Sequence, residues 1–205
     1  MGERKSIVIF GGSFNPPHNC HISIAKQALK EYEEIEKIIF VPVTDRYPKD
    51  GLIENKHRYN MLKSVAEENN RFVVSDIDMK ENETLPTIEL LEKMKRQYKD
   101  KEIWVLMGSD NLKIIHQWDR AEELISEYKY LIMERNQDIM EEIIKKNKIL
   151  TLYKENFKKL KTVFERNLSS TYIRELIISN KSIKEYVPDE VSKYIEKNKL
   201  YERNE

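Results

Sequence analysis

Two histidines three residues apart, just after a pair of glycines, are the residues of this chain best suited to chemistry. They lie in residues 11–21, which read Gly-Gly-Ser-Phe-Asn-Pro-Pro-His-Asn-Cys-His. Glycine lets the backbone approach a ligand closely, and a helix N-terminus offers free N–H groups to phosphate. Before the segment, an apolar run predicts a buried strand at Ser6–Phe10; after it, helical spacing predicts a helix. The apolar stripe of this helix consists of Ile22, Ala25, Leu29 and Tyr32. His18 and His21 lie at the start of the helix and are therefore predicted to face a phosphate.

Such a site suits a reaction that builds up charge on phosphate oxygens. Two imidazoles can donate hydrogen bonds to those oxygens without any covalent intermediate. The alternative is that the histidines only cap the helix. Cys20, between them, could be a thiol nucleophile, but no orienting third group lies nearby. A zinc site is poorly supported, because the Cys and His residues crowd into one helical turn.

The segment resembles the GxFxPxHxGH signature of the nucleotidyltransferase superfamily, which transfers a nucleoside monophosphate from a triphosphate to a phosphate acceptor. The resemblance implies that His18 and His21 contact the triphosphate. Cys20 is a departure, since the family usually has glycine there. The ATP site implied by the resemblance includes Gly11, Gly12, Ser13 and Phe14.

A second motif reads Asn-Leu-Ser-Ser-Thr-Tyr-Ile-Arg and covers residues 167–174. Ser169 or Ser170 can cap a following helix, and an ordinary serine-capped helix would explain the motif equally well. The motif resembles the ISSTxIR element of the same superfamily, with Leu168 in place of isoleucine. The resemblance implies that the triphosphate binds, opposite the histidines, to Ser169, Ser170, Thr171 and Arg174.

Two further features resemble the adenylyltransferases that act on pyridine mononucleotides. Gly108-Ser109-Asp110 resembles their G-[AST]-D turn, in which the aspartate contacts ribose hydroxyls; Gly108 and Asp110 are thus implied at the ATP site. Asp110 could instead cap a helix. Trp118 resembles the tryptophan that stacks on the pyridine ring, although the sequence alone favours a core tryptophan.

The loop over residues 42–52 lacks the PPHK-type element of the bacterial nicotinate mononucleotide enzymes. It resembles the VxDxYxKxGL loop of the eukaryotic enzymes that accept both the acid and the amide, and His57-Arg58 follows it as in that branch. Lys49 is then the candidate phosphate-binding lysine. The aromatic residue expected before Thr87 and the Pro-Gly expected after Arg135 are missing. The mononucleotide site implied by the resemblance consists of Tyr47, Thr87, Trp118 and Arg135.

Strands and helices are predicted to alternate along nearly the whole chain, which indicates an α/β, Rossmann-like doubly wound parallel sheet with a C-terminal helical segment. The lysine-rich stretch 138–160 is ambiguous and fits a surface helix followed by a strand. The tail, residues 182–200, is predicted to hold an amphipathic helix after Pro188. Further strands are predicted at residues 37–43, 71–75, 102–107, 129–133 and 162–165, and helices at 57–68 and from Pro86 to about Tyr98.

Length and composition limit the number of domains, the partners and the compartment that we expect. The 205 residues suit a single nucleotidyltransferase domain spanning 1–205, and 36 basic residues balance 36 acidic ones, so no global basic field attracts nucleic acid. One cysteine fits a reducing compartment. With no membrane-length apolar run and no signal-peptide pattern at Met1–Lys5, we expect a cytoplasmic protein without membrane or nucleic-acid partners.

The resemblance covers Ile7 to Arg174 and implies an adenylyltransferase of NAD biosynthesis. It would join ATP and nicotinate (or nicotinamide) mononucleotide into a dinucleotide and release pyrophosphate, with Mg²⁺ arriving on ATP. The residues expected to stabilise the phosphates in catalysis are His18, His21, Lys49 and Arg174. Two alternatives stay open: a nucleotidyltransferase for pantetheine phosphate or glycerol phosphate, and a non-catalytic nucleotide-binding module. The sequence also leaves open whether the chain forms a homo-oligomer.

Overall fold

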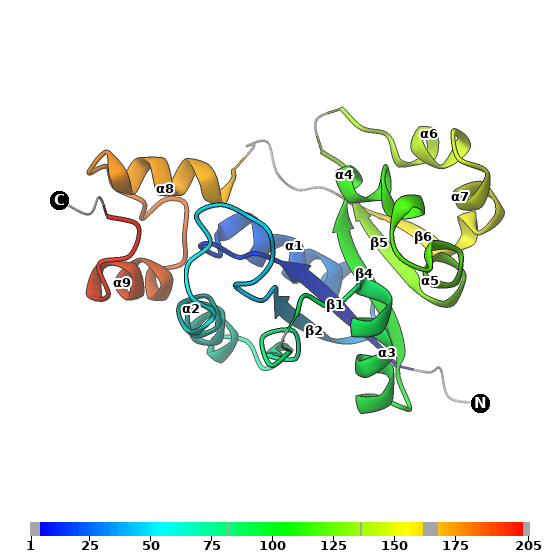
Figure 1. Ribbon diagram of the computed structural model, residues 1–205, viewed down its shortest axis with the longest axis horizontal. Coiled ribbons are helices and arrows are strands. Elements are labelled where there is room, and N and C mark those ends of the chain that lie inside the picture. Colours follow the sequence, from blue (N-terminus) through cyan, green and yellow to red (C-terminus); the bar gives the residue numbers. More distant parts are fainter. Residues whose placement is uncertain (1–4, 82, 136, 162–167, 203–205) are drawn as a thin grey trace.

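The computed structural model describes residues 5–81, 83–135, 137–161 and 168–202. Within these ranges, six parallel strands form one sheet in the order β3-β2-β1-β4-β5-β6 (Figure 1). This architecture confirms the predicted Rossmann-like parallel sheet. The strands are β1 (Ser6–Gly12), β2 (Ile35–Pro42), β3 (Phe72–Val74), β4 (Glu102–Gly108), β5 (Lys129–Met133) and β6 (Phe157–Leu160).

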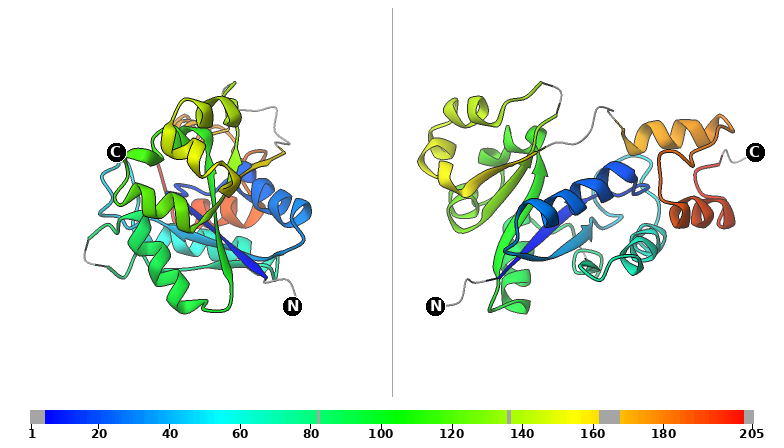
Figure 2. Two further views of the ribbon diagram at one scale, coloured as in Figure 1. Left: turned by 90° about the vertical axis from the view of Figure 1, so that its right-hand side faces the viewer. Right: turned by 180° about the vertical axis from the view of Figure 1, so that it is seen from behind.

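Helices cover both faces of the sheet (Figure 2, left). Successive residues of a strand point to opposite faces, so Val8 and Phe10 join one apolar cluster while Ile7 and Ile9 join the other. The first cluster is closed by α1 (Asn19–Glu31), α2 (Asn55–Glu67), α8 (Ser170–Ile178) and α9 (Asp189–Lys197). The second is closed by α3 (Thr87–Gln97), α4 (Ser109–Leu112), the 3-10 turn η1 (Ile115–Gln117), α5 (Ala121–Glu127), α6 (Met140–Lys145) and α7 (Lys148–Leu152).

The structure defines the lysine-rich stretch 138–160, which was ambiguous from the sequence. It contains two short helices, α6 and α7, the 3-10 turn η2 (Lys154–Asn156) and the edge strand β6. This agrees with a helical segment followed by a strand. The further strand predicted at 162–165 lies outside the described residues.

The C-terminal segment lies beyond the carboxyl ends of β1 and β2, as both the front view and the view from behind show (Figures 1 and 2). Its amphipathic helix α9 follows Pro188, as predicted. The Tyr194 hydroxyl fixes α9 to α2: it accepts a hydrogen bond from Asn60 Nδ2 at 3.1 Å and lies 3.1 Å from His57 Nδ1. Among the described helices, none has the length and apolar character needed to span a membrane.

Candidate active site

The candidate site lies where the strand order reverses. β1 is flanked by β2 on one side and by β4 on the other, so chain connections leave β1 and β4 in opposite directions. In open parallel sheets, ligands bind beyond the carboxyl ends of the strands at such a point. Gly11 and Gly12 end β1, and Gly108 ends β4. A side chain at Gly11 would meet nothing within 4 Å, so open space adjoins the backbone there.

The two histidines form a stacked pair at the start of α1. His18 occupies the N-cap in an extended conformation, and its ring centroid lies 3.6 Å from that of His21. The His18 backbone N–H donates to His21 Nδ1 at 3.2 Å. A neutral imidazole that accepts at Nδ1 carries its proton on Nε2. His21 therefore offers Nε2–H as a donor.

Both imidazoles are neutral near pH 7. Burial, helped by the charge of Arg135, lowers the pKa of His18 to about 4. Burial also lowers the pKa of His21 well below its usual value, with further contributions from His18, Arg135 and Lys49. His18 is only 4% exposed, and its Nδ1 has no hydrogen-bond partner among the described residues. A buried polar atom without a partner fits a site that a ligand completes.

The loop between β2 and α2 brings a lysine to the glycine turn. Lys49 Nζ donates to Ser13 Oγ at 2.9 Å. Partial burial, then the charge of Arg174, lowers the pKa of Lys49. Lys49 and Arg174 thus repel each other in the free protein, and a polyanion between them would relieve that repulsion.

The second motif docks directly on the first, although more than 150 residues separate them. Ser169 is the N-cap of α8, and its Oγ accepts from the Tyr172 N–H at 3.2 Å. Ser170 Oγ donates to the Pro16 carbonyl at 2.8 Å. Arg174 donates to the Asn15 carbonyl at 2.8 Å and to Thr171 Oγ1 at 3.3 Å. The structure therefore brings the serine motif and the histidine motif together, as the family resemblance implied.

The turn after β4 holds the third motif. The N-cap of α4 is Gly108, so the expectation that Asp110 could cap this helix is wrong. The Asp110 side chain is largely exposed. A Cβ at Gly108 would lie 2.2 Å from Asp110 Oδ1 and 3.2 Å from Arg135 Nε. Arg135 and Asp110, whose charged groups are 4.0 Å apart, therefore converge over this glycine. Ser109 Oγ fixes the turn by donating to Asp138 and accepting from the Arg135 N–H.

The other candidate mononucleotide residues come from three separate segments. Tyr47 is 41% exposed in the β2–α2 loop, and Thr87 is the first residue of α3. Trp118 is half-buried and packs against the second apolar cluster, so it is neither a fully buried core residue nor a free surface one. Within the described ranges, no hydrogen bond or ring contact joins these three residues to one another.

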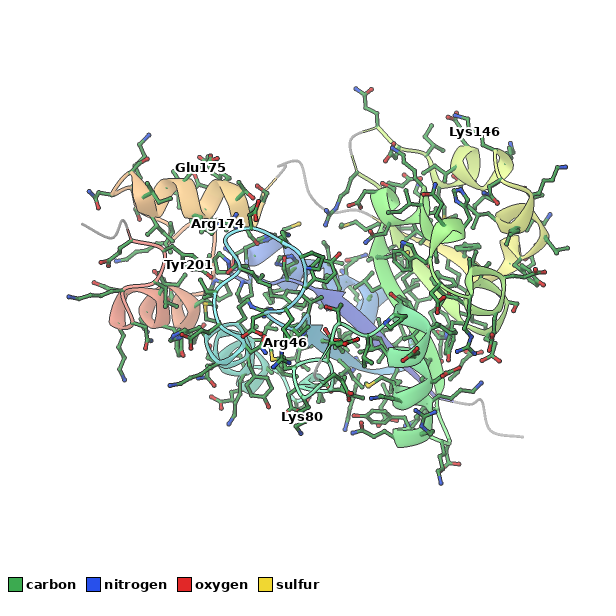
Figure 3. The ribbon with its side chains drawn as sticks, in the orientation of Figure 1. Arg46, Lys80, Lys146, Arg174, Glu175 and Tyr201 are labelled. Atoms are coloured by element: carbon green, nitrogen blue, oxygen red, sulfur yellow. The ribbon has the colours of Figure 1, made fainter. Side chains whose placement is uncertain are left out.

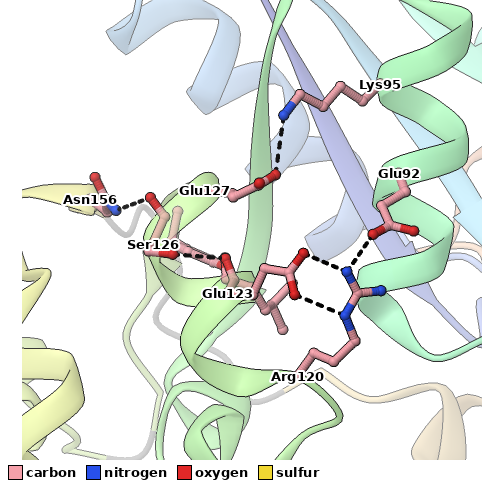
Figure 4. A network of polar contacts seen from close by, with 9 residues as sticks. Glu92, Lys95, Arg120, Glu123, Ser126, Glu127 and Asn156 are labelled. Atoms are coloured by element: carbon pink, nitrogen blue, oxygen red, sulfur yellow. Dashed lines mark hydrogen bonds and ion pairs between the residues drawn. The ribbon is translucent and has the colours of Figure 1, made fainter.

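A polar network ties the segment of Trp118 to α3 (Figure 4). Arg120 precedes α5 in the left-handed conformation, with φ of 48°. Its guanidinium donates to Glu92 of α3 at 2.7 Å and also binds Glu123. The network fixes the end of the Trp118 turn relative to the helix that begins at Thr87.

Two buried polar residues, Arg58 and Asn15, hold the site together although the sequence analysis assigned them no role in it. Arg58, fully buried, donates to the carbonyls of Ile53 and Ser13 at 2.9 and 3.1 Å and so holds the β2–α2 loop against the glycine turn. Asn15 is 1% exposed and binds both that loop and the C-terminal segment. The His57-Arg58 pair was a signal for Arg58, whereas nothing in the local pattern indicated the contacts of Asn15.

Neither thiol nor protein-metal chemistry gains support from this geometry. Burial raises the pKa of Cys20, and the opposing charge of Arg135 is a smaller effect, so the thiol is protonated near pH 7. A protonated thiol is a poor nucleophile. In the part of the chain that the structure describes, no three His, Cys, Asp or Glu residues gather as a metal-binding group.

Known proteins share both this fold and this sequence pattern. The Cytidylyltransferase-like family matches residues 9–176. A protein of Caldicellulosiruptor bescii named probable nicotinate-nucleotide adenylyltransferase is 32% identical over 200 residues, covering 96% of this chain and 99% of its own. A protein of the same name from Clostridium acetobutylicum is 30% identical over 199 residues, with the same coverage. The structure of Plasmodium falciparum nicotinic acid mononucleotide adenylyltransferase complexed with NaAD has a TM-score of 0.78 at 26% identity, covering 96% of this chain and 97% of that one.

The family match runs from the middle of β1 into α8, and so contains all three motifs of the site. Such a site, on a sheet of this topology, is that of a nucleotidyltransferase. The chain belongs to the Cytidylyltransferase-like family and, through its near-full-length relatives, to the nicotinate-nucleotide adenylyltransferases.

Proposed function

We propose that this protein transfers the adenylyl group of ATP to nicotinate mononucleotide, and less efficiently to nicotinamide mononucleotide, in NAD biosynthesis. An oxygen of the mononucleotide phosphate attacks the α-phosphorus of ATP. The bond from that phosphorus to the oxygen bridging to the β-phosphate breaks, and pyrophosphate leaves. The attacking phosphate is already a nucleophile, so the site needs no general base.

The observation that carries this proposal is the docking of α8 on the histidine motif. Ser170 and Arg174 bind the Pro16 and Asn15 carbonyls, two and three residues before His18. Neutral donors and cations of the two motifs are thereby held near one another at the strand-order reversal. An array of this kind stabilises charge on phosphate oxygens as it develops in the transition state.

Each group then has a distinct role. His18 and His21 donate hydrogen bonds to the phosphates as neutral imidazoles, whereas Lys49 and Arg174 supply positive charge to the α-phosphate and the departing pyrophosphate. The end of β1 and the start of α8 form the remaining ATP contacts: Gly11, Gly12, Ser13, Phe14, Ser169, Ser170 and Thr171. Gly108 and Asp110 complete the ATP site at the end of β4, with the Asp110 carboxylate accepting from a ribose diol.

The mononucleotide is proposed to bind on the side of the site formed by Tyr47, Thr87, Trp118 and Arg135. The half-buried Trp118 keeps part of its indole accessible for stacking on a pyridinium ring. The Plasmodium falciparum enzyme has been solved complexed with NaAD and with APC, which supports nucleotide ligands for this fold. Mg²⁺ is proposed to enter with ATP, where it would supply positive charge to the phosphates. Residues 1–205 are proposed to act as one domain.

An acceptor screen tests the proposal. The purified full chain is incubated with ATP, Mg²⁺ and one acceptor at a time, and both pyrophosphate release and dinucleotide formation are measured. The acceptors are nicotinate mononucleotide, nicotinamide mononucleotide, 4′-phosphopantetheine and glycerol 3-phosphate. We expect turnover with the pyridine mononucleotides alone. Turnover with another acceptor would replace the proposed substrate, and pyrophosphate release with none of them would indicate a nucleotide-binding module.

A further inference from the structure

The C-terminal segment reaches the candidate site through a single hydroxyl group. After α9, Lys199 and Tyr201 both take the left-handed conformation, with φ of 49° and 66°. The buried Leu200 between them donates its N–H to the Ile195 carbonyl, which closes the end of the helix. Two non-glycine residues in this conformation within three positions are uncommon, and such backbone is retained where the surroundings require it. Here it turns Tyr201 back toward the sheet.

The Tyr201 hydroxyl donates to Asn15 Oδ1 at 2.9 Å. Burial raises the pKa of Tyr201, while the charges of Arg174 and Arg58 act in the opposite direction. Tyr201 and Arg174 also lie near each other, beside the β2–α2 loop, in Figure 3. The hydroxyl therefore reaches the candidate site from a segment that has no role in the proposed function.

Asn15 connects three of the groups proposed to bind phosphate. Its Nδ2 donates to the Gly51 carbonyl at 2.7 Å, two residues after Lys49. Its own carbonyl accepts from Arg174, and it lies three residues before His18. Without the Tyr201 hydroxyl, Asn15 Oδ1 would keep only the N–H of Ile53, at 3.4 Å. The Tyr201 hydroxyl thus donates the shorter of the two hydrogen bonds that the oxygen of this 1%-exposed amide accepts.

We propose that Tyr201 is a positioning residue which, through Asn15, sets the geometry of Lys49, Arg174 and the histidine pair around the triphosphate of ATP. This inference rests on the proposed function in that it takes ATP as the ligand. It gives the C-terminal segment a role in phosphate binding that packing of α9 alone does not require. Tyr201 itself touches no reacting atom.

The first test removes only the hydroxyl. In Tyr201→Phe, loss of the partner of a buried acceptor should lower kcat/KM for ATP and weaken ATP binding by about five- to thirtyfold. The KM for the mononucleotide should change by less than about twofold. Tyr194→Phe is the matched control, because Tyr194 lies in the same segment and contacts α2 instead of Asn15. It should lower the melting temperature at least as much as Tyr201→Phe while keeping kcat/KM for ATP near that of the wild type.

The second test asks whether Tyr201 acts through Asn15. Asn15→Ala should lower kcat/KM for ATP, and adding Tyr201→Phe to it should cause no further loss, since the connecting group is already gone. Additive losses in the double variant would overturn the proposal. Equal losses of kcat/KM in Tyr194→Phe and Tyr201→Phe would also overturn it, because packing of the C-terminal segment would then explain both.

Calorimetric titration of ATP with Mg²⁺ separates this inference from the proposed function. A wild-type chain that turns over no acceptor, but loses ATP affinity in Tyr201→Phe and not in Tyr194→Phe, would contradict the function and support the role of Tyr201. A wild-type chain that forms the dinucleotide with unchanged kinetics in Tyr201→Phe would support the function and reject the role.

Discussion

At the scale of single residues, His21 is the group whose chemical state the structure defines most closely. Its Nδ1 accepts from the His18 N–H, which leaves Nε2–H as the donor, and its lowered pKa keeps it neutral. We predict that His21→Ala lowers kcat at least about a hundredfold, the loss typical of removing one donor to a developing charge. The KM for the mononucleotide should change little, which steady-state kinetics with each substrate varied in turn will measure.

A conservative replacement provides the control for this prediction. The side chain of His21→Asn can accept from the His18 N–H and still donate a neutral N–H. It should therefore retain more activity than His21→Ala. A folded His21→Ala variant with wild-type kcat would show that His21 does not face the phosphates.

The buried state of His18 predicts how stability depends on pH. Its pKa is about 4 in the folded protein and 6.5 in its unperturbed state, so between these values the unfolded chain binds the extra proton. The free energy of unfolding should have its full value above about pH 6.5 and fall as the pH decreases toward 4. Urea denaturation at pH 7.5, 6 and 5 measures this slope. In His18→Gln the slope should be shallower, and an unchanged slope would mean that other groups cause it.

The family resemblance implied that the histidine pair, the serine motif and Lys49 serve one site. Their partners could not be found in the same way, because a buried polar contact leaves no local pattern. Asn15 and Tyr201 are 186 residues apart, and only the folded chain shows that they meet. Likewise, the burial that lowers the pKa values of both histidines follows from packing and not from spacing.

At the scale of elements, a substitution at the end of β1 can test ATP binding separately from the stability of the fold. A Cβ at Gly11 would meet nothing within 4 Å, so Gly11→Ala should fold as stably as the wild type or slightly better. If the triphosphate lies against this backbone, the added methyl group should raise the KM for ATP about tenfold or more. Thermal unfolding and ATP kinetics check the two halves. An unchanged KM for ATP would place the phosphates elsewhere.

The elements that the sequence predicted well are those with strong apolar periodicity. β5 (Lys129–Met133) was predicted with the bounds that the structure has, and β1 and β4 extend only a little further at their ends. β6 was harder, because its sequence, Phe-Lys-Lys-Leu, buries only its two ends at the edge of the sheet. The helices before it have six and five residues, too few to show a clear helical period.

At the scale of the whole molecule, the strand order explains why motifs far apart in sequence serve one site. Parallel strands direct all their carboxyl ends to the same edge, so the loops after β1, β2, β4 and β5 meet there. The sequence predicted this edge from the alternation of strands and helices. The placement of α8 on the histidine motif was implied only by the family resemblance, because a contact between Ser170 and Pro16, 154 residues apart, leaves no local sequence pattern.

The choice between nicotinate and nicotinamide mononucleotide is a property of this whole arrangement. Two arginines that could pair with the nicotinate carboxylate already have partners. Arg46 donates to the Glu81 carbonyl, and Arg135 pairs with Asp110 while its charge acts on His18. Discrimination then rests on a few hydrogen bonds of about 1 to 3 kcal/mol each.

We predict activity on both substrates, with the acid favoured about ten- to a hundredfold by the excess of positive charge at the site. The measurement is kcat/KM for each mononucleotide at equal ATP and Mg²⁺. A ratio above about 10⁴ would require a dedicated partner for the carboxylate or the amide, because only a buried group left unpaired by the wrong substrate discriminates that strongly.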